Sequence, residues 1–175
     1  MNSSLLQHGL AGALICIACV GMAQPTNTAT NVKKATPVKK STSTKVEWQT
    51  DFGKASAEAK ADNKYILMDF SGSDWCGWCM KLDEEVFSKK AFKEFAKSDL
   101  VCVIVDFPRA KKLPAKLTRQ NSELQNKYKV HGYPTVILLS PDGELAATLG
   151  YQEGGPEKYV EDLKKMIEAH KQKAK

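Results

Sequence analysis

The chain has 175 residues, of which 42% are hydrophobic, 8% aromatic and 26% charged, which is room for one domain with a proper core plus appendages. Its formal net charge is +6, but five lysines precede the region that reads as a folded domain: Lys33, Lys34, Lys39, Lys40 and Lys45. Subtracting them leaves +1, so the domain is nearly neutral and the composition argues against a nucleic-acid partner.

An uncharged, mostly apolar run extends from Gly9 to Ala23 and ends in small residues that suit signal peptidase. It is shorter than the roughly 20 residues of a membrane span. We therefore expect residues 1–23 to be a signal peptide and the protein to be periplasmic or secreted. An alternative is cleavage before Cys19, which would make the chain a lipoprotein anchored at that residue.

Residues 24–46 are rich in Thr, Ala, Lys, Pro, Asn and Ser, with no aromatic residue and no acid. Such a segment buries too little apolar surface to offset the entropy of ordering it. We expect a flexible basic linker here, followed by a single domain over residues 47–175.

The domain opens with helix and strand signals in alternation. Asp51 is placed to cap a helix that continues to about Ala61, and residues 62–64 turn the chain. The apolar run from Tyr65 to Phe70 is typical of a buried strand, and residues 71–74 interrupt it with turn chemistry.

Two cysteines, Cys76 and Cys79, follow that turn at the predicted start of a helix. Residues three apart on a helix are neighbours, so the pair can form a disulfide without much backbone movement. Free N–H groups and the helix dipole favour a thiolate at Cys76, which makes it the attacking sulfur. Cys79, one turn further and more buried, is then the resolving sulfur.

Cys102 is the odd cysteine that remains once a cleaved signal peptide has removed Cys16 and Cys19. It lies in an apolar strand candidate, Leu100 to Val105, and is expected to be buried and inert. One Cys-x-x-Cys pair with one odd cysteine does not resemble a disulfide-stapled scaffold.

The segments around Cys102 alternate between helix and loop. Ser88 is a candidate cap for a helix over residues 91–96. Residues 107–119 form a basic, proline-containing loop, which either lies beside the cysteines and biases which partners dock or is a solvated insertion without a role. A helix over residues 120–128 follows.

The last part of the chain predicts a hairpin and a terminal helix. Residues 140–143 form the turn between strands at 136–139 and 144–149. Gly154-Gly155-Pro156 begins a helix with a core stripe of Tyr159, Leu163, Met166 and Ile167, and residues 171–175 are expected to fray.

Three motifs together resemble the thioredoxin superfamily: Asp69-Phe70, Trp75-Cys76-Gly77-Trp78-Cys79, and Gly132-Tyr133-Pro134-Thr135 before an apolar run. The resemblance covers about residues 48–170 and is strongest to secreted or periplasmic members, including the C-terminal domain of the bacterial transmembrane disulfide reductase. Trp78 stands where the thioredoxin pattern has proline, and Asp69 lies one residue further from the first cysteine than the family's buried aspartate does.

The resemblance implies an α/β thioredoxin-like fold, a central mixed sheet flanked by helices with the Cys-x-x-Cys at a helix N-terminus. It implies that Asp69 accepts the proton of the resolving thiol and that the Tyr133–Pro134 bond is cis. The residues expected to bind substrate are Trp75, Gly77, Trp78, Tyr133, Pro134 and Gly150.

These features predict an exported protein thiol–disulfide oxidoreductase that reduces protein disulfides through Cys76 and Cys79. It needs no organic cofactor or metal, acts as a monomer, and takes electrons from an external donor such as a membrane disulfide reductase. Two alternatives remain: a copper or zinc carrier that uses Cys76, Cys79 and His131, and an interaction module with a permanent structural disulfide.

Overall fold

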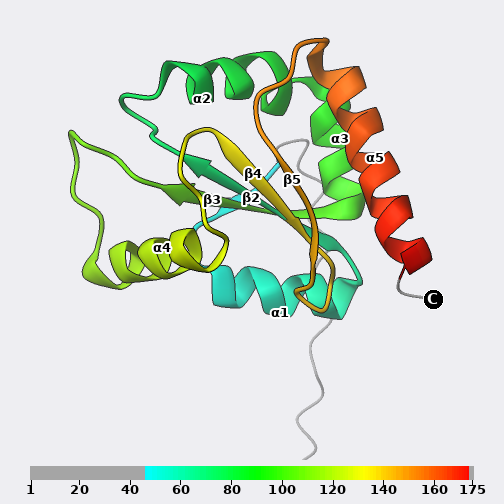
Figure 1. Ribbon diagram of the computed structural model, residues 1–175, viewed down its shortest axis with the longest axis horizontal. Helices are drawn as coiled ribbons and strands as arrows, with labels where there is room; N and C mark the ends of the chain where they lie inside the picture. Colours follow the sequence, from blue (N-terminus) through cyan, green and yellow to red (C-terminus); the bar gives the residue numbers. More distant parts are fainter. Residues whose placement is uncertain (1–45, 174–175) are drawn as a thin grey trace, which may run out of the picture. The chain divides into compact units, whose positions relative to one another are not determined.

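A five-stranded sheet forms the centre of the molecule. The structure, a computed structural model, describes residues 46–173. The strand order is β1-β3-β2-β4-β5, in which β1 and β2 run parallel to β3, while β4 runs antiparallel to both β2 and β5 (Figure 1). The bounds are β1 Trp48–Gln49, β2 Tyr65–Ser71, β3 Leu100–Asp106, β4 Thr135–Leu139 and β5 Leu145–Leu149. The predicted mixed sheet is confirmed.

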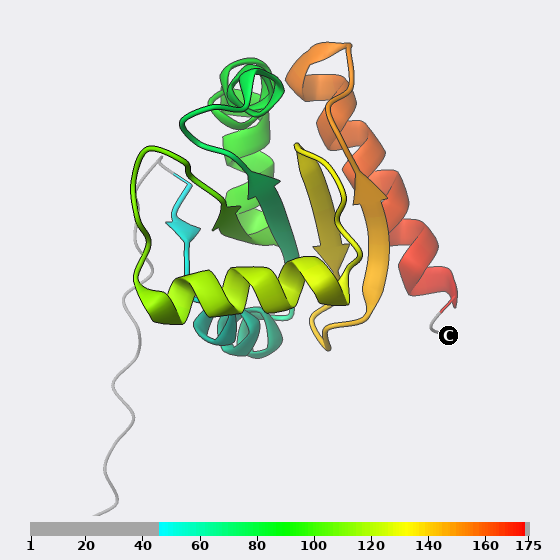
Figure 2. The ribbon, with the colours of Figure 1, turned by 60° about the vertical axis from the view of Figure 1, so that its left-hand side comes forward.

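Helices cover both faces of this sheet (Figure 2). One face carries α1 (Phe52–Asp62) and α4 (Ala115–Lys127). The other carries α2 (Gly77–Leu82) with the π-helical turn η1 (Asp83–Phe87), α3 (Lys90–Asp99) and α5 (Gly155–Lys173).

Strand β2 contributes side chains to the hydrophobic clusters on both faces of the sheet. Successive side chains of a strand point to opposite faces. Ile66, Met68 and Phe70 therefore pack with α1 and α4, whereas Tyr65 and Leu67 pack with the helices of the other face. All seven residues of β2 are buried, as expected for a central strand covered on both sides.

Several local signals act as the sequence predicts. The carboxylate of Asp51 accepts a hydrogen bond from the backbone N–H of Lys54 and caps α1. Asn63 ends that helix in the left-handed conformation. In the hairpin turn, the N–H of Gly143 donates to the carbonyl of Ser140, and the φ of Gly143 is +86°.

Other predictions are wrong in detail. Ser88 does not cap α3, because its hydroxyl donates to the carbonyl of Glu84 and the N-cap is Lys89. Residues 115–119 belong to α4 and not to the basic loop, which therefore spans residues 107–114. Helix α5 continues to Lys173, so the fraying predicted from residue 171 is not found at residues 171–173.

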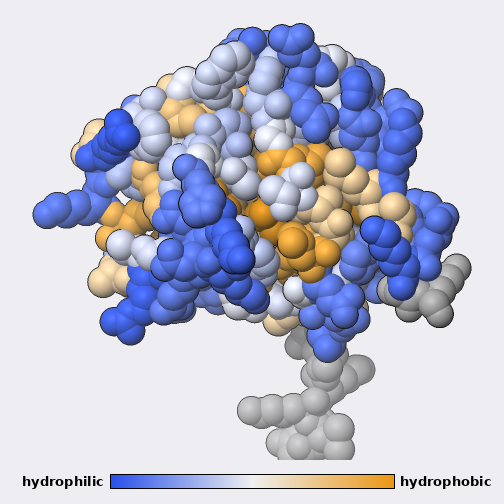
Figure 3. Space-filling model, in the orientation of Figure 1, coloured by the Kyte–Doolittle hydropathy of each residue, from blue (hydrophilic) through white to orange (hydrophobic). Residues whose placement is uncertain are grey.

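The predicted signal peptide lies outside the described residues, as does all of the predicted linker except Val46. None of the helices within residues 46–173 combines the length and apolarity that a membrane span requires. Figure 3 shows apolar surface gathered over β5, where Leu145 is 55% exposed, with hydrophilic residues around it.

Candidate active site

Cys76 and Cys79 form a disulfide at the start of α2, with their Cα atoms 5.3 Å apart. Cys76 is the N-cap residue, and its Sγ accepts a hydrogen bond from the backbone N–H of Cys79 at 3.2 Å. The N-terminus of a helix stabilises negative charge, and no acidic residue lies in the first turn of α2. This placement favours a thiolate on Cys76 once the disulfide is reduced.

The expected difference in burial between the two cysteine residues is not found. In the disulfide form, Cys76 is 5% exposed and Cys79 is 4% exposed. Their inequality therefore rests on their positions along the helix, because only Cys76 occupies the cap. Cys102 is free and buried, and burial raises the pKa of its thiol, as expected for an inert cysteine.

Asp69 is buried in β2 with 5% of its surface exposed. The alternation of the strand turns its side chain toward the face that α2 covers, the same face as Leu67. Burial, reinforced by the negative charges of Asp83 and Asp106, raises its pKa from 3.8 to about 7. Its Oδ1 has no hydrogen-bond partner among the described residues.

Burial therefore brings the pKa of Asp69 close to neutral pH. A carboxyl group whose pKa lies near the working pH exchanges protons with little driving force in either direction. Asp69 is buried although it lies one residue further from the first cysteine than the family's aspartate does. It lies within β2 rather than at the end of that strand.

The Gly132-Tyr133-Pro134-Thr135 motif lies next to the Cys-x-x-Cys motif. The Tyr133–Pro134 peptide bond is cis, as the resemblance implied. The ring of Trp75 meets the ring of Tyr133 edge to face, with centroids 5.8 Å apart. Gly150 lies close by, since a Cβ atom built on it would be 3.5 Å from the carbonyl oxygen of Pro134.

The two tryptophans of the motif have different surroundings. Trp75 is half-buried, and its Nε1 donates a hydrogen bond to the carbonyl of Phe107 at 2.8 Å. Trp78 is 58% exposed and contacts Tyr151, with ring centroids 5.2 Å apart. Sequence reasoning missed Tyr151, for which its position directly after Gly150 was the only available signal.

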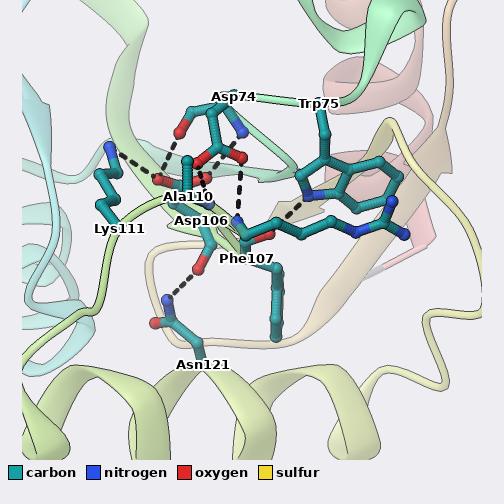
Figure 4. A network of polar contacts seen from close by, with 9 residues as sticks. Asp74, Trp75, Asp106, Phe107, Ala110, Lys111 and Asn121 are labelled. Carbon is teal, nitrogen blue, oxygen red and sulfur yellow. Dashed lines mark hydrogen bonds and ion pairs between the residues drawn. The ribbon is translucent and has the colours of Figure 1, made fainter.

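The basic loop, residues 107–114, lies against the turn before Cys76 (Figure 4). The carboxylate of Asp74 accepts the backbone N–H groups of Arg109 and Ala110, at 2.9 and 2.8 Å. These hydrogen bonds hold the pKa of Asp74 below its usual value. The loop thus contacts the residues directly before Cys76, and an effect on which partners dock stays a prediction.

Asp106 anchors the same loop from the end of β3 (Figure 4). Its carboxylate accepts the backbone N–H and the hydroxyl of Ser73 and pairs with Lys111 at 3.3 Å. The buried side chain of Asn121 in α4 donates to the Asp106 carbonyl at 2.8 Å. The sequence offers no local signal for the contacts with Ser73 and Asn121, because these residues lie 33 and 15 positions from Asp106.

His131 is exposed and is not brought into a metal centre. Within residues 46–173, no group of three or more His, Cys, Asp or Glu side chains is placed to hold a metal ion. The metal-carrier alternative therefore lacks its third ligand in the described part of the chain.

Comparison with known proteins adds evolutionary evidence to this geometry. Residues 52–167 match the family described as a thioredoxin-like domain. The disulfide bond reductase DsbH of Chlamydia pneumoniae is 34% identical over 122 residues, covering 70% of this chain and 73% of that protein. A solved structure of a DsbH oxidoreductase aligns with a TM-score of 0.68 and 32% identity, covering 79% of this chain and 93% of the other.

A longer relative matches over only part of its length. The thiol:disulfide interchange protein DsbD of a Pseudomonas species is 28% identical over 152 residues, covering 81% of this chain and 24% of that protein. The chain thus spans about a quarter of DsbD.

Proposed function

The chain belongs to the thioredoxin-like domain family, and we propose that it is an exported reductase of protein disulfides. It is a thiol–disulfide oxidoreductase, and the observation that carries this is the Cys76–Cys79 disulfide at the start of α2. The reductase direction is supported by the similarity to DsbH, which is a disulfide bond reductase.

The reaction we propose begins with reduced Cys76. Its thiolate attacks one sulfur of a substrate disulfide, forming a mixed disulfide and releasing the other substrate sulfur as a thiolate that takes up a proton. Cys79 then loses its proton to Asp69, attacks the Sγ of Cys76 and displaces the second substrate thiolate. This thiolate takes up a proton, and Asp69 releases the proton that it received. The substrate gains two electrons and two protons, and the Cys76–Cys79 bond closes.

An external dithiol donor must then return two electrons to the pair, and a membrane disulfide reductase is the donor class we propose. The substrate groove is proposed to be formed by Trp75, Gly77, Trp78, Tyr133, Pro134 and Gly150. We propose a monomer that acts without nucleic acid, metal or organic cofactor.

Export is supported by the apolar run before Gln24 and by the similarity to the Dsb proteins. In this proposal signal peptidase cuts after Ala23, and the basic segment 24–46 becomes the N-terminal part of the exported protein. Sequencing the N-terminus of the exported protein tests this directly: Gln24 supports cleavage after Ala23, whereas a lipid-modified Cys19 contradicts it.

The reductase activity is tested by insulin reduction with dithiothreitol as the electron donor. Wild type should accelerate the reaction, Cys76→Ser should abolish the acceleration, and Cys102→Ser, the matched control, should retain it. Pre-reduced Cys79→Ser that has been freed of dithiothreitol should accumulate a mixed disulfide with insulin, because the resolving thiol is missing. Insulin reduction by Cys76→Ser at the wild-type rate would refute the mechanism.

A further inference from the structure

Arg109 places a positive charge beside the residue that precedes the attacking cysteine. Its guanidinium carbon lies 3.7 Å from the ring centroid of Trp75, within the range of a cation–π contact. Trp75 is in turn fixed from other directions, by its hydrogen bond to Phe107 and by the ring of Tyr133. The cation therefore stands next to the proposed substrate groove.

The backbone on both sides of Arg109 is held in place (Figure 4). The N–H groups of Arg109 and Ala110 donate to Asp74, and the N–H of Phe107 donates to the carbonyl of Ser71 at 2.8 Å. Because these bonds involve the main chain, the position of the loop does not depend on the Arg109 side chain. The guanidinium is thus presented from a fixed support, which reduces the entropy lost when it binds a partner.

The charge of Arg109 has no acidic partner in the described part of the chain. The nearby carboxylates are engaged elsewhere, Asp74 by backbone N–H groups and Asp106 by Ser73 and Lys111. Within residues 46–173 the guanidinium takes part in no hydrogen bond or ion pair. Stacking covers only a face of the group, so its N–H donors around the edge remain available to a ligand.

Lys81, the cation near Trp78, differs from Arg109 in that it pairs with a carboxylate. Lys81 lies 5.0 Å from the ring centroids of both Trp78 and Tyr151 and pairs with Glu85 at 3.9 Å. The hydroxyl of Tyr151 also donates to Glu85 at 2.6 Å. Negative charge therefore compensates Lys81, and the uncompensated cation lies on the Trp75 side of the disulfide.

We propose that Arg109 is a specificity-determining residue that binds a carboxylate of the substrate close to its reacting disulfide. The preferred substrates are protein segments that carry Asp or Glu beside the cysteine that Cys76 attacks. A carboxylate matches the fork of N–H donors on a guanidinium and forms a charge-assisted pair with it. This inference rests on the proposed disulfide reductase function and assigns it a substrate class.

The test compares two disulfide-linked peptides that differ only in Glu or Gln next to the cysteine, together with the small neutral disulfide bis(2-hydroxyethyl) disulfide. The kcat/KM of each substrate is measured for wild type, Arg109→Gln and the loop control Lys112→Gln. Wild type and Lys112→Gln should prefer the Glu peptide about five- to tenfold, a preference of the size expected for a charge-assisted contact at an interface. Arg109→Gln should reduce that preference to less than about twofold.

The neutral disulfide separates the possible failures. Its rate should be the same in all three proteins, because it offers no carboxylate. If Arg109→Gln slows every substrate equally, Arg109 acts through Trp75 or Cys76 and the specificity proposal is overturned. If wild type shows no preference for Glu, the proposal also fails, while reduction of the neutral disulfide still supports the reductase. Failure of wild type to reduce even that disulfide would refute the reductase function itself.

Discussion

The buried carboxyl group of Asp69 makes the stability of the domain depend on pH. It is 5% exposed, and burial raises its pKa from 3.8 to about 7. Asp69→Asn preserves the shape of the side chain and removes its ionisation. Since the two proteins share every other titrating group, the difference between their stabilities isolates this one titration.

The sign follows from which state binds more protons. In the unfolded chain Asp69 ionises near 3.8, and in the folded protein near 7. Between these values the unfolded chain holds fewer protons, so the free energy of unfolding falls as the pH rises and becomes level above about 8. At about 1.4 kcal/mol per pH unit, the ionisation of Asp69 lowers the free energy of unfolding by roughly 2 kcal/mol at pH 5 and by about 4 kcal/mol at pH 8.

Urea unfolding at several pH values measures this effect, with Cys76 and Cys79 kept oxidised so that neither sulfur titrates. The stability of Asp69→Asn relative to wild type should increase by about 2–3 kcal/mol between pH 5 and pH 8. A constant difference over this range would mean that Asp69 ionises like a solvated carboxylate. The proposed role of Asp69 as the proton acceptor for Cys79 would then fail.

Three further outcomes follow from packing. Gly72→Ala should lower the free energy of unfolding by about 1–3 kcal/mol and alter the fluorescence of Trp75, because the new Cβ would overlap the indole ring. The control Gly77→Ala, whose Cβ would meet open space, should leave the free energy of unfolding unchanged. Equal effects of the two substitutions would contradict this packing. Leu163→Ala should lower the urea-unfolding free energy by about 2–5 kcal/mol, since the side chain is fully buried, and a loss below about 1 kcal/mol would be inconsistent with that burial. Peptide mapping after alkylation of the reduced, folded protein should find Cys102 unlabelled until denaturant is added, and rapid labelling would show an accessible thiol.

The elements with strong local signals were predictable from sequence. The apolar run of β2 and the cap of α1 at Asp51 are set by neighbouring residues, so the patterns predicted them correctly. Strand β1 was not predicted, because two residues carry no periodicity and Trp48 and Gln49 become a strand only by pairing with β3. The π-helical turn η1 was not predicted either, because Val86 continues the ordinary helical spacing of Cys79 and Leu82.

The boundary between the basic loop and α4 depends on contacts distant in sequence. Lys116 and Arg119 made residues 115–119 look like loop, but α4 begins at Ala115. The side chain of Gln120 accepts from the N–H of Phe52 and donates to the carbonyl of Thr50, which lie 68 and 70 residues away. Such tertiary contacts override the local composition.

The candidate site also contains some residues that were predictable from the sequence and others that were not. Cys76 and Pro134 were found because each belongs to a motif in the sequence, and their positions follow from the fold that the motifs imply. Arg109 was seen only as one charge of a basic loop. Its place over Trp75 depends on hydrogen bonds between Asp74 and the backbone 35 and 36 residues later, which no local pattern encodes.

The reduction potential of the Cys76–Cys79 couple tests the central claim most directly. Equilibration in glutathione buffers, followed by the fluorescence of Trp75 and Trp78, gives this value. A reductase predicts a potential at or below roughly −230 mV, toward the thioredoxin end of the known range. A value of about −120 to −180 mV would mark an oxidant or isomerase and contradict the proposed direction of electron flow.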